Sequence, residues 1–217
     1  MDSVIDINWI GCDHCAWDGD VTKRLFDIVI STTALFLLSP LFILVALLIR
    51  LDSKGPIFFS QNRMGKQSQK FRFWKFRSMD VDAEKHKATL MKLNKMQGGV
   101  LFKMENDPRI TRVGRFIRKM SIDELPQLWN VLIGDMSLVG PRPPLPNEVA
   151  QYTPYQRRRL GATPGITCIW QVSGRSNIPF EQQVEMDLKY IANQSVWYDM
   201  GLLLKTIPAV LKGQGAF

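Results

Sequence analysis

Residues 25–49 read LFDIVISTTALFLLSPLFILVALLI, an apolar run that Ser39 and Pro40 interrupt near its middle. At about 20 residues per crossing, this run is long enough to span a bilayer. Pro40 has no amide hydrogen and its ring clashes with the preceding turn, so a helix must kink or break there. The run therefore predicts two apolar helical segments joined at a break.

Basic residues flank the run on both sides, since Lys23 and Arg24 precede it and Arg50 and Lys54 follow it. Positive charge is normally retained on the cytoplasmic side of a membrane. The two flanks together favour a re-entrant hairpin that enters one leaflet and returns. An ordinary single span is the alternative, and it would place the N-terminal residues on the far side.

The 22 residues that precede the hairpin hold five aspartates and no Lys or Arg. Cys12 and Cys15 in this extension have half the spacing of a zinc site, but no second Cys/His pair completes it. An extension without a metal site is therefore the favoured interpretation. Labelling of these two cysteines from outside intact cells would distinguish a full span from a re-entrant hairpin, because only a span exposes them.

Composition limits the class of protein. The 217 residues suffice for one globular domain beside the hairpin. Three cysteines provide no disulfide framework, which fits a reducing cytosol. The net charge is +8, and residues 23–217 carry 28 basic against 15 acidic residues, or +13. This surplus indicates anionic partners, namely lipid headgroups, phosphorylated substrates or nucleic acid.

Two strands are predicted after the hairpin. Residues 57–61 (IFFSQ) form a short apolar strand, and residues 70–77 (KFRFWKFR) nearly alternate basic with aromatic residues. The segment around Arg63 and Gly65 predicts the turn between them. We expect most of the basic side chains here on a solvated strand face or against headgroups.

The segment SIDELPQLWNVLIG, residues 121–134, holds two adjacent acids, Asp123 and Glu124. Ser121 and Glu124 match a capping box. A helix capped at Ser121 would place Pro126 at its fifth position, where a proline is disruptive. We therefore expect the helix to begin near Pro126, with both acids just before it, where free amides favour anions.

Four arginines recur every third residue and predict one face of a helix: Arg109, Arg112, Arg115 and Arg118. Arg118 lies shortly before the two acids. Because carboxylate oxygens are the ligands that Mg²⁺ prefers, Arg118 with the acids makes a candidate phosphate or Mg²⁺ centre. A solvated basic face is the alternative for the other three.

Three further segments are candidates for the site or the membrane. Prolines in residues 140–146 stiffen the backbone around Arg142, which suits bidentate phosphate binding, although a rigid connector is the alternative. Residues 166–175 predict an apolar strand that leads through a glycine turn to Arg175. Residues 196–211 are apolar with Pro208 inside, and we expect them in the membrane interface or in the core.

Taken together, these motifs resemble the bacterial sugar transferases, the monotopic polyprenol-phosphate phosphoglycosyl transferases, over residues 23–217. The matching segments, in order, are KRLFD (23–27), the Ser39-Pro40 break, GPIFFSQNRMG (55–65), FWKFRSM (73–79), NDPRITRVGRFIRKMSIDELPQLWNVLIGDMSLVGPRP (106–143), PGITCIWQVSGR (164–175) and MDLKYI (186–191). The closing GQGAF resembles the branch that transfers hexose-1-phosphate.

The resemblance implies a mainly helical α+β fold that is membrane-monotopic. It would have an acidic extension at 1–22, a re-entrant helix-break-helix hairpin at 23–50, and a catalytic domain at 51–217 with interfacial amphipathic helices and a small β element. The protein would lie on the cytoplasmic face of the bacterial inner membrane, in contact with membrane lipids. The resemblance is also compatible with a homodimer.

The resemblance further implies a two-step phosphoryl transfer with Mg²⁺ as cofactor. Asp123 would attack the β-phosphate of a UDP-sugar, release UMP and retain a phosphosugar on its carboxylate. Undecaprenyl phosphate would then take the phosphosugar from Asp123. By position, Glu124 would assist, Asp123 would hold the metal, and the phosphate contacts would come from Lys75, Arg118 and Arg175, with weaker matches at Arg142 and Asp187.

The C-terminal resemblance favours UDP-galactose or UDP-glucose over N-acetylated donors, and the product would begin a surface glycan such as exopolysaccharide, capsule or O-antigen. Two other functions are alternatives. A Mg²⁺-dependent phosphatase with the same two acids would make free phosphosugar. A membrane-tethered nucleic-acid-binding protein would use the +13 charge, but the sequence has no helix-turn-helix or zinc-finger signature.

Overall fold

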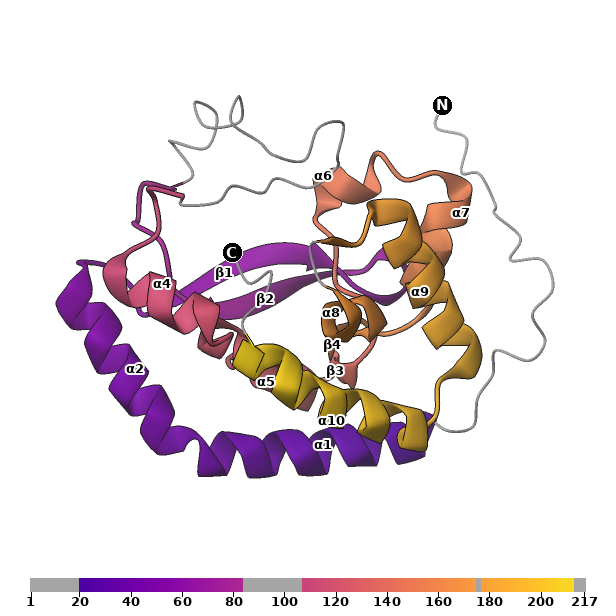
Figure 1. Cartoon of the computed structure of the whole chain (residues 1–217), viewed down its shortest axis with the longest axis horizontal. Coiled ribbons are helices and arrows are strands. Elements are labelled where there is room, and N and C mark those ends of the chain that lie inside the picture. The colour runs from indigo at the N-terminus through magenta and orange to yellow at the C-terminus, as the bar shows by residue number, and fades with distance from the viewer. Residues whose placement is uncertain (1–19, 84–106, 175–176, 213–217) are drawn as a thin grey trace.

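The computed structural model describes residues 20–83, 107–174 and 177–212. The apolar run forms α1 (Asp20–Leu37) and α2 (Ser39–Asp52), which are bent by 59° relative to each other. Pro40 lies in the first turn of α2, and the Ser39 hydroxyl donates to the carbonyl of Phe36 at 2.8 Å. The predicted helix-break-helix is confirmed, and it runs along the lower edge of the molecule in Figure 1.

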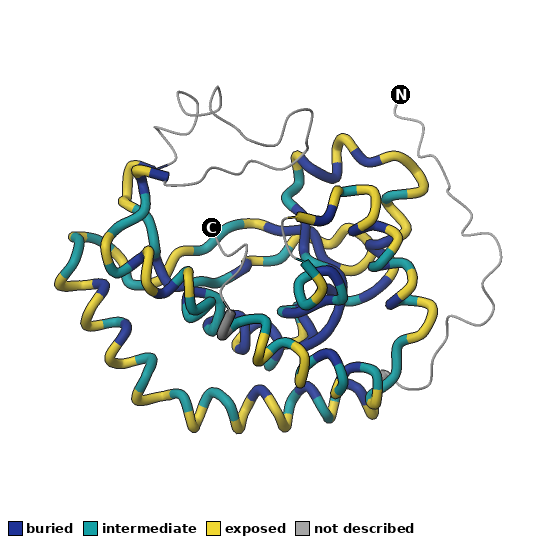
Figure 2. Tube along the Cα trace, viewed as in Figure 1, coloured by how far each residue is buried: buried dark blue, intermediate teal, exposed yellow. Residues whose placement is uncertain are grey.

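Within the described ranges, no helix alone has the length and hydropathy needed to cross a membrane, whereas Val21–Leu37 and Ser39–Asp52 reach them together across the bend. Much of this pair is exposed (Figure 2). The exposed apolar side chains include Leu25, Val29, Phe36, Leu37, Ile43, Leu44, Leu47 and Leu51. Contiguous exposed apolar surface of this kind marks an interaction site.

The described residues form two small sheets of two strands each. Strand β1 (Phe58–Met64) pairs antiparallel with β2 (Lys70–Phe76), through a turn that contains η1 (Lys66–Ser68). The predicted pair is confirmed, but β1 continues to Met64. Strands β3 (Ser137–Val139) and β4 (Gly165–Thr167) pair in parallel.

Helices surround these strands (Figure 1). They are α4 (Arg112–Lys119), η3 (Ile122–Glu124), α5 (Gln127–Ile133), α6 (Pro146–Val149), α7 (Pro154–Arg157), η4 (Arg158–Gly161), α8 (Ile169–Ser173), α9 (Phe180–Asn193) and α10 (Val196–Lys212). The main core joins β2, α5, β3, α9 and α10 through Phe73, Leu128, Val131, Met136, Leu138, Val139, Tyr190 and Leu202. The described chain is thus mainly helical with a small β element.

Two local predictions need correction. Helix α4 begins after Thr111, whose hydroxyl caps it by accepting from the Gly114 amide at 2.9 Å. Arg109 therefore precedes the helix, and its guanidinium pairs with Asp107 instead of extending a basic helical face. The predicted strand at 166–175 is also wrong beyond Thr167, because α8 follows; a short apolar run is compatible with a buried helix as well as with a strand.

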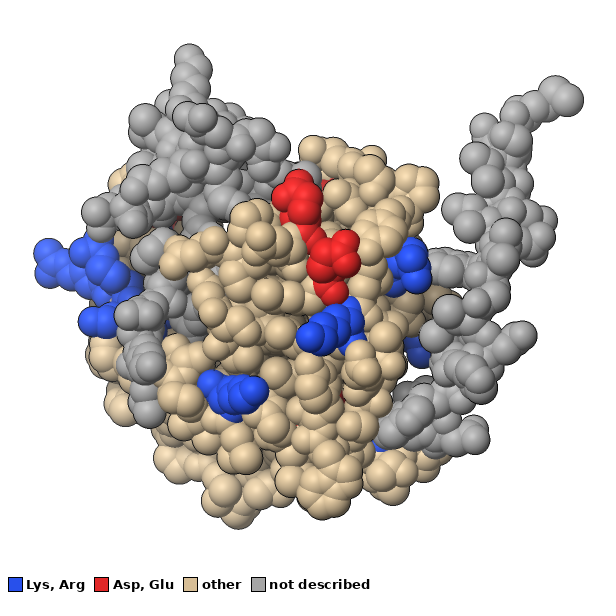
Figure 3. All heavy atoms as spheres, turned by 45° about the vertical axis from the view of Figure 1, so that its right-hand side comes forward, with Lys and Arg blue, Asp and Glu red and all other residues tan. Residues whose placement is uncertain are grey.

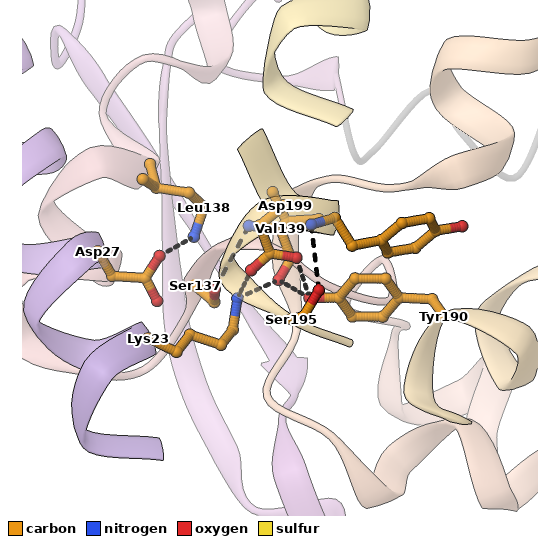
Figure 4. A network of polar contacts seen from close by, with 9 residues as sticks. Lys23, Asp27, Ser137, Leu138, Val139, Tyr190, Ser195 and Asp199 are labelled. Atoms are coloured by element: carbon orange, nitrogen blue, oxygen red, sulfur yellow. Dashed lines mark hydrogen bonds and ion pairs between the residues drawn. The ribbon is translucent and has the colours of Figure 1, made fainter. Parts of the chain in front are cut away.

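A buried polar network joins the hairpin to the rest of the molecule (Figure 4). Lys23 on α1 pairs with Asp199 on α10 and donates to the carbonyl of Val139 at 3.2 Å. The Tyr190 hydroxyl is 2.8 Å from the Asp199 carboxylate, and Asp27 accepts from the Leu138 amide at 3.1 Å. We call Lys23, Asp27, Tyr190 and Asp199 the hairpin clamp. Here Lys23 neutralises a buried carboxylate of the protein, a role that its position in the basic flank of the apolar run does not predict.

Candidate active site

The two predicted acids occupy η3, between α4 and α5. Pro126 caps α5 with φ −61°, so the helix begins where the sequence predicted and Ser121 provides no side-chain cap. Asp123 is buried at 6% exposure. The Lys75 ammonium, from β2, donates to Glu124 at 2.6 Å and lies 3.8 Å from Asp123. The fold therefore brings these three residues together from segments 49 positions apart.

The surroundings move the pKa values of the two acids in opposite directions. Burial raises the pKa of Asp123 to about 6, although the nearby Lys75 opposes this effect. Burial also disfavours the charge of Glu124, but the hydrogen-bonded Lys75 ammonium outweighs it and lowers the pKa of Glu124. Neighbouring carboxylates with separated pKa values are typical of sites with distinct chemical roles. Above pH 6, Asp123 is ionised and is a more basic carboxylate than an ordinary aspartate.

The raised pKa of Asp123 predicts a pH dependence. If its carboxylate is the nucleophile, the rate of the first chemical step should fall about tenfold per pH unit below about pH 6, where the acid is protonated. Lys75→Met removes the charge that lowers this pKa, so the acid limb should move to higher pH. Single-turnover rates across pH would measure both effects, and a limb that stays in place or moves to lower pH would contradict the assignment.

These acids line a cavity of about 730 Å³, a volume in the range of small-molecule sites. The charged side chains of the lining include Arg63, Lys75, Arg77, Arg109, Arg118, Asp123, Glu124, Arg142 and Glu148. Arg118 and Arg142 therefore reach the same cavity as the acids, as the sequence predicted. A cavity with this excess of cations suits a phosphorylated ligand.

Asn130 on α5 positions the strand that carries Lys75. Its side chain is fully buried, donates to the carbonyl of Arg72 at 2.7 Å, and accepts from the Trp74 amide at 3.1 Å. These bonds satisfy the edge of β2 that faces away from β1 and hold it against α5. Sequence reasoning missed Asn130, because an asparagine inside a helical pattern has no distinctive spacing.

The remaining candidate residues differ in their placement. Asp187 on α9 is buried at 1% exposure, pairs with Arg159, and is not among the residues that line the cavity. Burial raises its pKa to about 6, against the attraction of Arg159. Arg175 lies outside the described residues, as do Cys12 and Cys15. Arg63 belongs to the segment whose basic side chains were expected mostly on a solvated strand face or against headgroups, but it is buried in the cavity wall.

The protein groups in this region provide only some of the ligands that a metal ion needs. Among the described residues, no group of three or more His, Cys, Asp or Glu side chains is arranged to hold one. Mg²⁺ is commonly bound through one or two carboxylates together with substrate phosphates. Asp123 and Glu124 therefore fit Mg²⁺ that arrives with a phosphorylated ligand, rather than a metal held in a complete protein cage.

The chain is similar to known sugar transferases. Galactosyl transferase CpsE of Streptococcus agalactiae is 50% identical over 197 residues, 90% of this chain and 43% of that protein. Undecaprenyl-phosphate galactose phosphotransferase of Salmonella typhimurium is 43% identical over 198 residues, 90% of this chain and 41% of that protein. The chain thus spans less than half the length of these two relatives.

A relative of comparable length is also present. Exopolysaccharide production protein ExoY of Rhizobium meliloti is 37% identical over 202 residues, which is 92% of this chain and 89% of that protein. A family model described as bacterial sugar transferase matches residues 19–213, which include the hairpin, the two acids and the cavity. The chain therefore belongs to the bacterial sugar transferase family.

Proposed function

We propose that the protein is a phosphoglycosyl transferase that moves a sugar-1-phosphate from a UDP-sugar to undecaprenyl phosphate and releases UMP. The observation that carries this proposal is the buried Asp123 beside Glu124 and Lys75 in a cation-rich cavity. The names of two relatives support galactose as the sugar. Glucose is proposed only from the C-terminal resemblance, and the name of a third relative makes an N-acetylated sugar the alternative within the same family. The product would begin an exopolysaccharide, capsule or O-antigen.

The proposed chemistry has two displacements at one phosphorus. The Asp123 carboxylate attacks the β-phosphorus of the UDP-sugar, the bond to the UMP oxygen breaks, and an acyl phosphate remains on Asp123. An oxygen of undecaprenyl phosphate then attacks this phosphorus and frees the carboxylate. Lys75, Arg118 and Arg142 neutralise the charge of the phosphates. Arg175 is proposed to join them.

Mg²⁺ is the proposed cofactor, and Asp123 and Glu124 would hold it together with the phosphorylated substrate. When bound, it would neutralise charge on the diphosphate. Lys75 would keep Glu124 ionised and oriented throughout, because its ammonium donates directly to that carboxylate.

The membrane placement is likewise a proposal. The hairpin of residues 23–50 would enter one leaflet from the cytoplasmic face of the bacterial inner membrane, with 51–217 as the catalytic domain and 1–22 as an extension. Its exposed apolar surface supports this, as do exposed tryptophans on α5 and α10, Trp129 and Trp197. The cysteine labelling described above tests it, since reaction from outside would favour a full span.

The decisive experiment uses the purified full chain in detergent with UDP-galactose and undecaprenyl phosphate. We expect UMP and lipid-linked galactose phosphate in equal amounts, and the loss of both on chelation of Mg²⁺. Without the lipid, UMP release should stop at about one per protein molecule, because the acyl phosphate awaits its acceptor. Continued release of free galactose phosphate without lipid would instead indicate the phosphatase alternative.

The nucleic-acid-binding alternative has less support. In the view of Figure 3, the Lys and Arg side chains drawn in blue form several separate groups on a mostly uncharged surface, and one of these groups lies against the acidic side chains drawn in red. Phosphate-backbone binding usually relies on a clustered basic patch or stripe. Many described cations instead line the cavity or bind protein groups, as Lys23 and Arg159 do.

A further inference from the structure

Arg63 differs from the other buried arginines. In the described part of the chain these are Arg63, Arg77, Arg109 and Arg159. Arg109 and Arg159 form ion pairs with aspartates, and Arg77 donates three hydrogen bonds to Ser53 and Lys54. Arg63 donates a single hydrogen bond, to the carbonyl of Pro143 at 3.0 Å. No described carboxylate lies within ion-pair distance of its guanidinium.

A buried guanidinium with one hydrogen bond is costly, because the charge has left water without full compensation. Arg63 is 8% exposed and its Nε has no hydrogen-bond partner. The Phe73 ring, 5.2 Å from its Cζ, compensates part of the cost. Burial, followed by repulsion from Arg142, lowers the pKa of Arg63 to about 10. Glu148 opposes this shift, but one of its oxygens already accepts from the Leu145 amide at 2.8 Å.

Arg63 belongs to the same cavity as the reacting carboxylate. The Lys75 ammonium lies 5.4 Å from the centre of the same Phe73 ring. Lys75 and Arg63 are therefore no more than about 11 Å apart, since each lies close to one ring centre. Both Arg142 and Arg63 also help to lower the pKa of Glu124, which places their charges near the acids. Arg63 and Arg142 therefore add positive charge to the cavity beyond that of Lys75, which already pairs with Glu124.

We propose that Arg63 and Arg142 form a second phosphate subsite, which binds the phosphate that leaves as UMP. This inference rests on the proposed function. When the Asp123 oxygen bonds to the β-phosphorus, the electrons of the broken bond go to the bridging oxygen, and the UMP phosphate gains one negative charge. The guanidinium of Arg63 stabilises this charge through its free N–H donors. Lys75 and Arg118 remain with the transferring phosphate.

Arg63→Met tests the subsite with UMP and UDP as probes, in the full chain in detergent and without lipid acceptor. Calorimetric titration should show binding of UMP weakened by about 10- to 100-fold, the range for a charge-assisted hydrogen bond. The thermal midpoint without nucleotide should stay the same or rise, because an uncompensated buried charge has been replaced by an apolar group. Arg72→Met is the matched control, since Arg72 is exposed on the same sheet above Trp74 and should leave UMP binding unchanged.

Unchanged UMP affinity in Arg63→Met would overturn the proposal. If the thermal midpoint also fell, the role of Arg63 would be purely structural. If Arg63→Met does not fold, Arg63→Lys replaces it. That variant keeps the charge but loses the planar fork, so UMP should bind at least fivefold more weakly, and unchanged binding again overturns the proposal. Wild-type protein that binds UMP but forms no lipid-linked sugar would refute the proposed function and leave the subsite standing.

Discussion

Asp123→Asn is expected to abolish the covalent intermediate and to lower turnover by about 10⁴-fold or more, the scale seen when a nucleophile is removed. Asparagine has nearly the same shape, but its amide oxygen carries no negative charge with which to form an acyl phosphate. The protein should be incubated with UDP-galactose labelled in the β-phosphate and then analysed by mass spectrometry. Wild-type protein should carry a phosphosugar on the peptide that contains Asp123, and the variant should carry none.

Two further variants control this experiment. Glu181 is an exposed acid on α9, so Glu181→Gln should keep wild-type labelling and turnover. Glu124→Gln retains the nucleophile, and we expect slower labelling that still maps to Asp123. A phosphosugar formed by Asp123→Asn at the wild-type rate would show that another residue is the nucleophile.

Removal of one partner from the hairpin clamp is expected to be the most destabilising change considered. Asp199→Leu leaves the Lys23 ammonium buried without a counter-charge, which should cost about 3–5 kcal/mol of unfolding free energy. Both residues are nearly inaccessible, at 8% exposure for Lys23 and 0% for Asp199, so solvent cannot replace the lost partner. Urea unfolding in detergent, followed by tryptophan fluorescence, would measure the loss.

The double variant Lys23→Met with Asp199→Leu separates the buried charge from the packing. Replacement of both charges by apolar side chains of similar size should recover most of the stability lost in Asp199→Leu. Lys189→Met, at an exposed position on α9, should change the unfolding free energy by less than about 0.5 kcal/mol. If Asp199→Leu were as stable as wild type, the network in Figure 4 would not be holding the hairpin.

Local elements of the fold were predictable wherever backbone chemistry is decisive. Pro40 breaks the apolar run, and Pro126 starts α5, because each proline removes an amide donor and restricts φ. The placement of Asp123 and Glu124 just before α5 followed from the same argument. Such restrictions act within one or two turns of chain and need no knowledge of the tertiary structure.

Predictions of where individual charged side chains lie were less successful. Spacing predicted Arg109 on a basic helical face, and Arg63 was predicted in a turn whose basic side chains are mostly solvated or against headgroups, but both side chains are buried. Whether a cation in a strand or beside a helix meets solvent depends on what packs over it, and periodicity contains no such information. The strand expected at 166–175 failed for a related reason, since an apolar run indicates burial without deciding between helix and strand.

The sequence by itself determined the broken apolar helix pair, the adjacent acids ahead of α5, and membership of a family of sugar transferases. Only the tertiary structure decided which charged side chains form ion pairs. Lys75 reaches Glu124 across 49 positions because Asn130 ties β2 to α5, and Lys23 meets Asp199 across 176 positions. Proline restricts its own φ and the conformation of the residue before it directly, whereas these ion pairs exist only once separate segments have packed and excluded water.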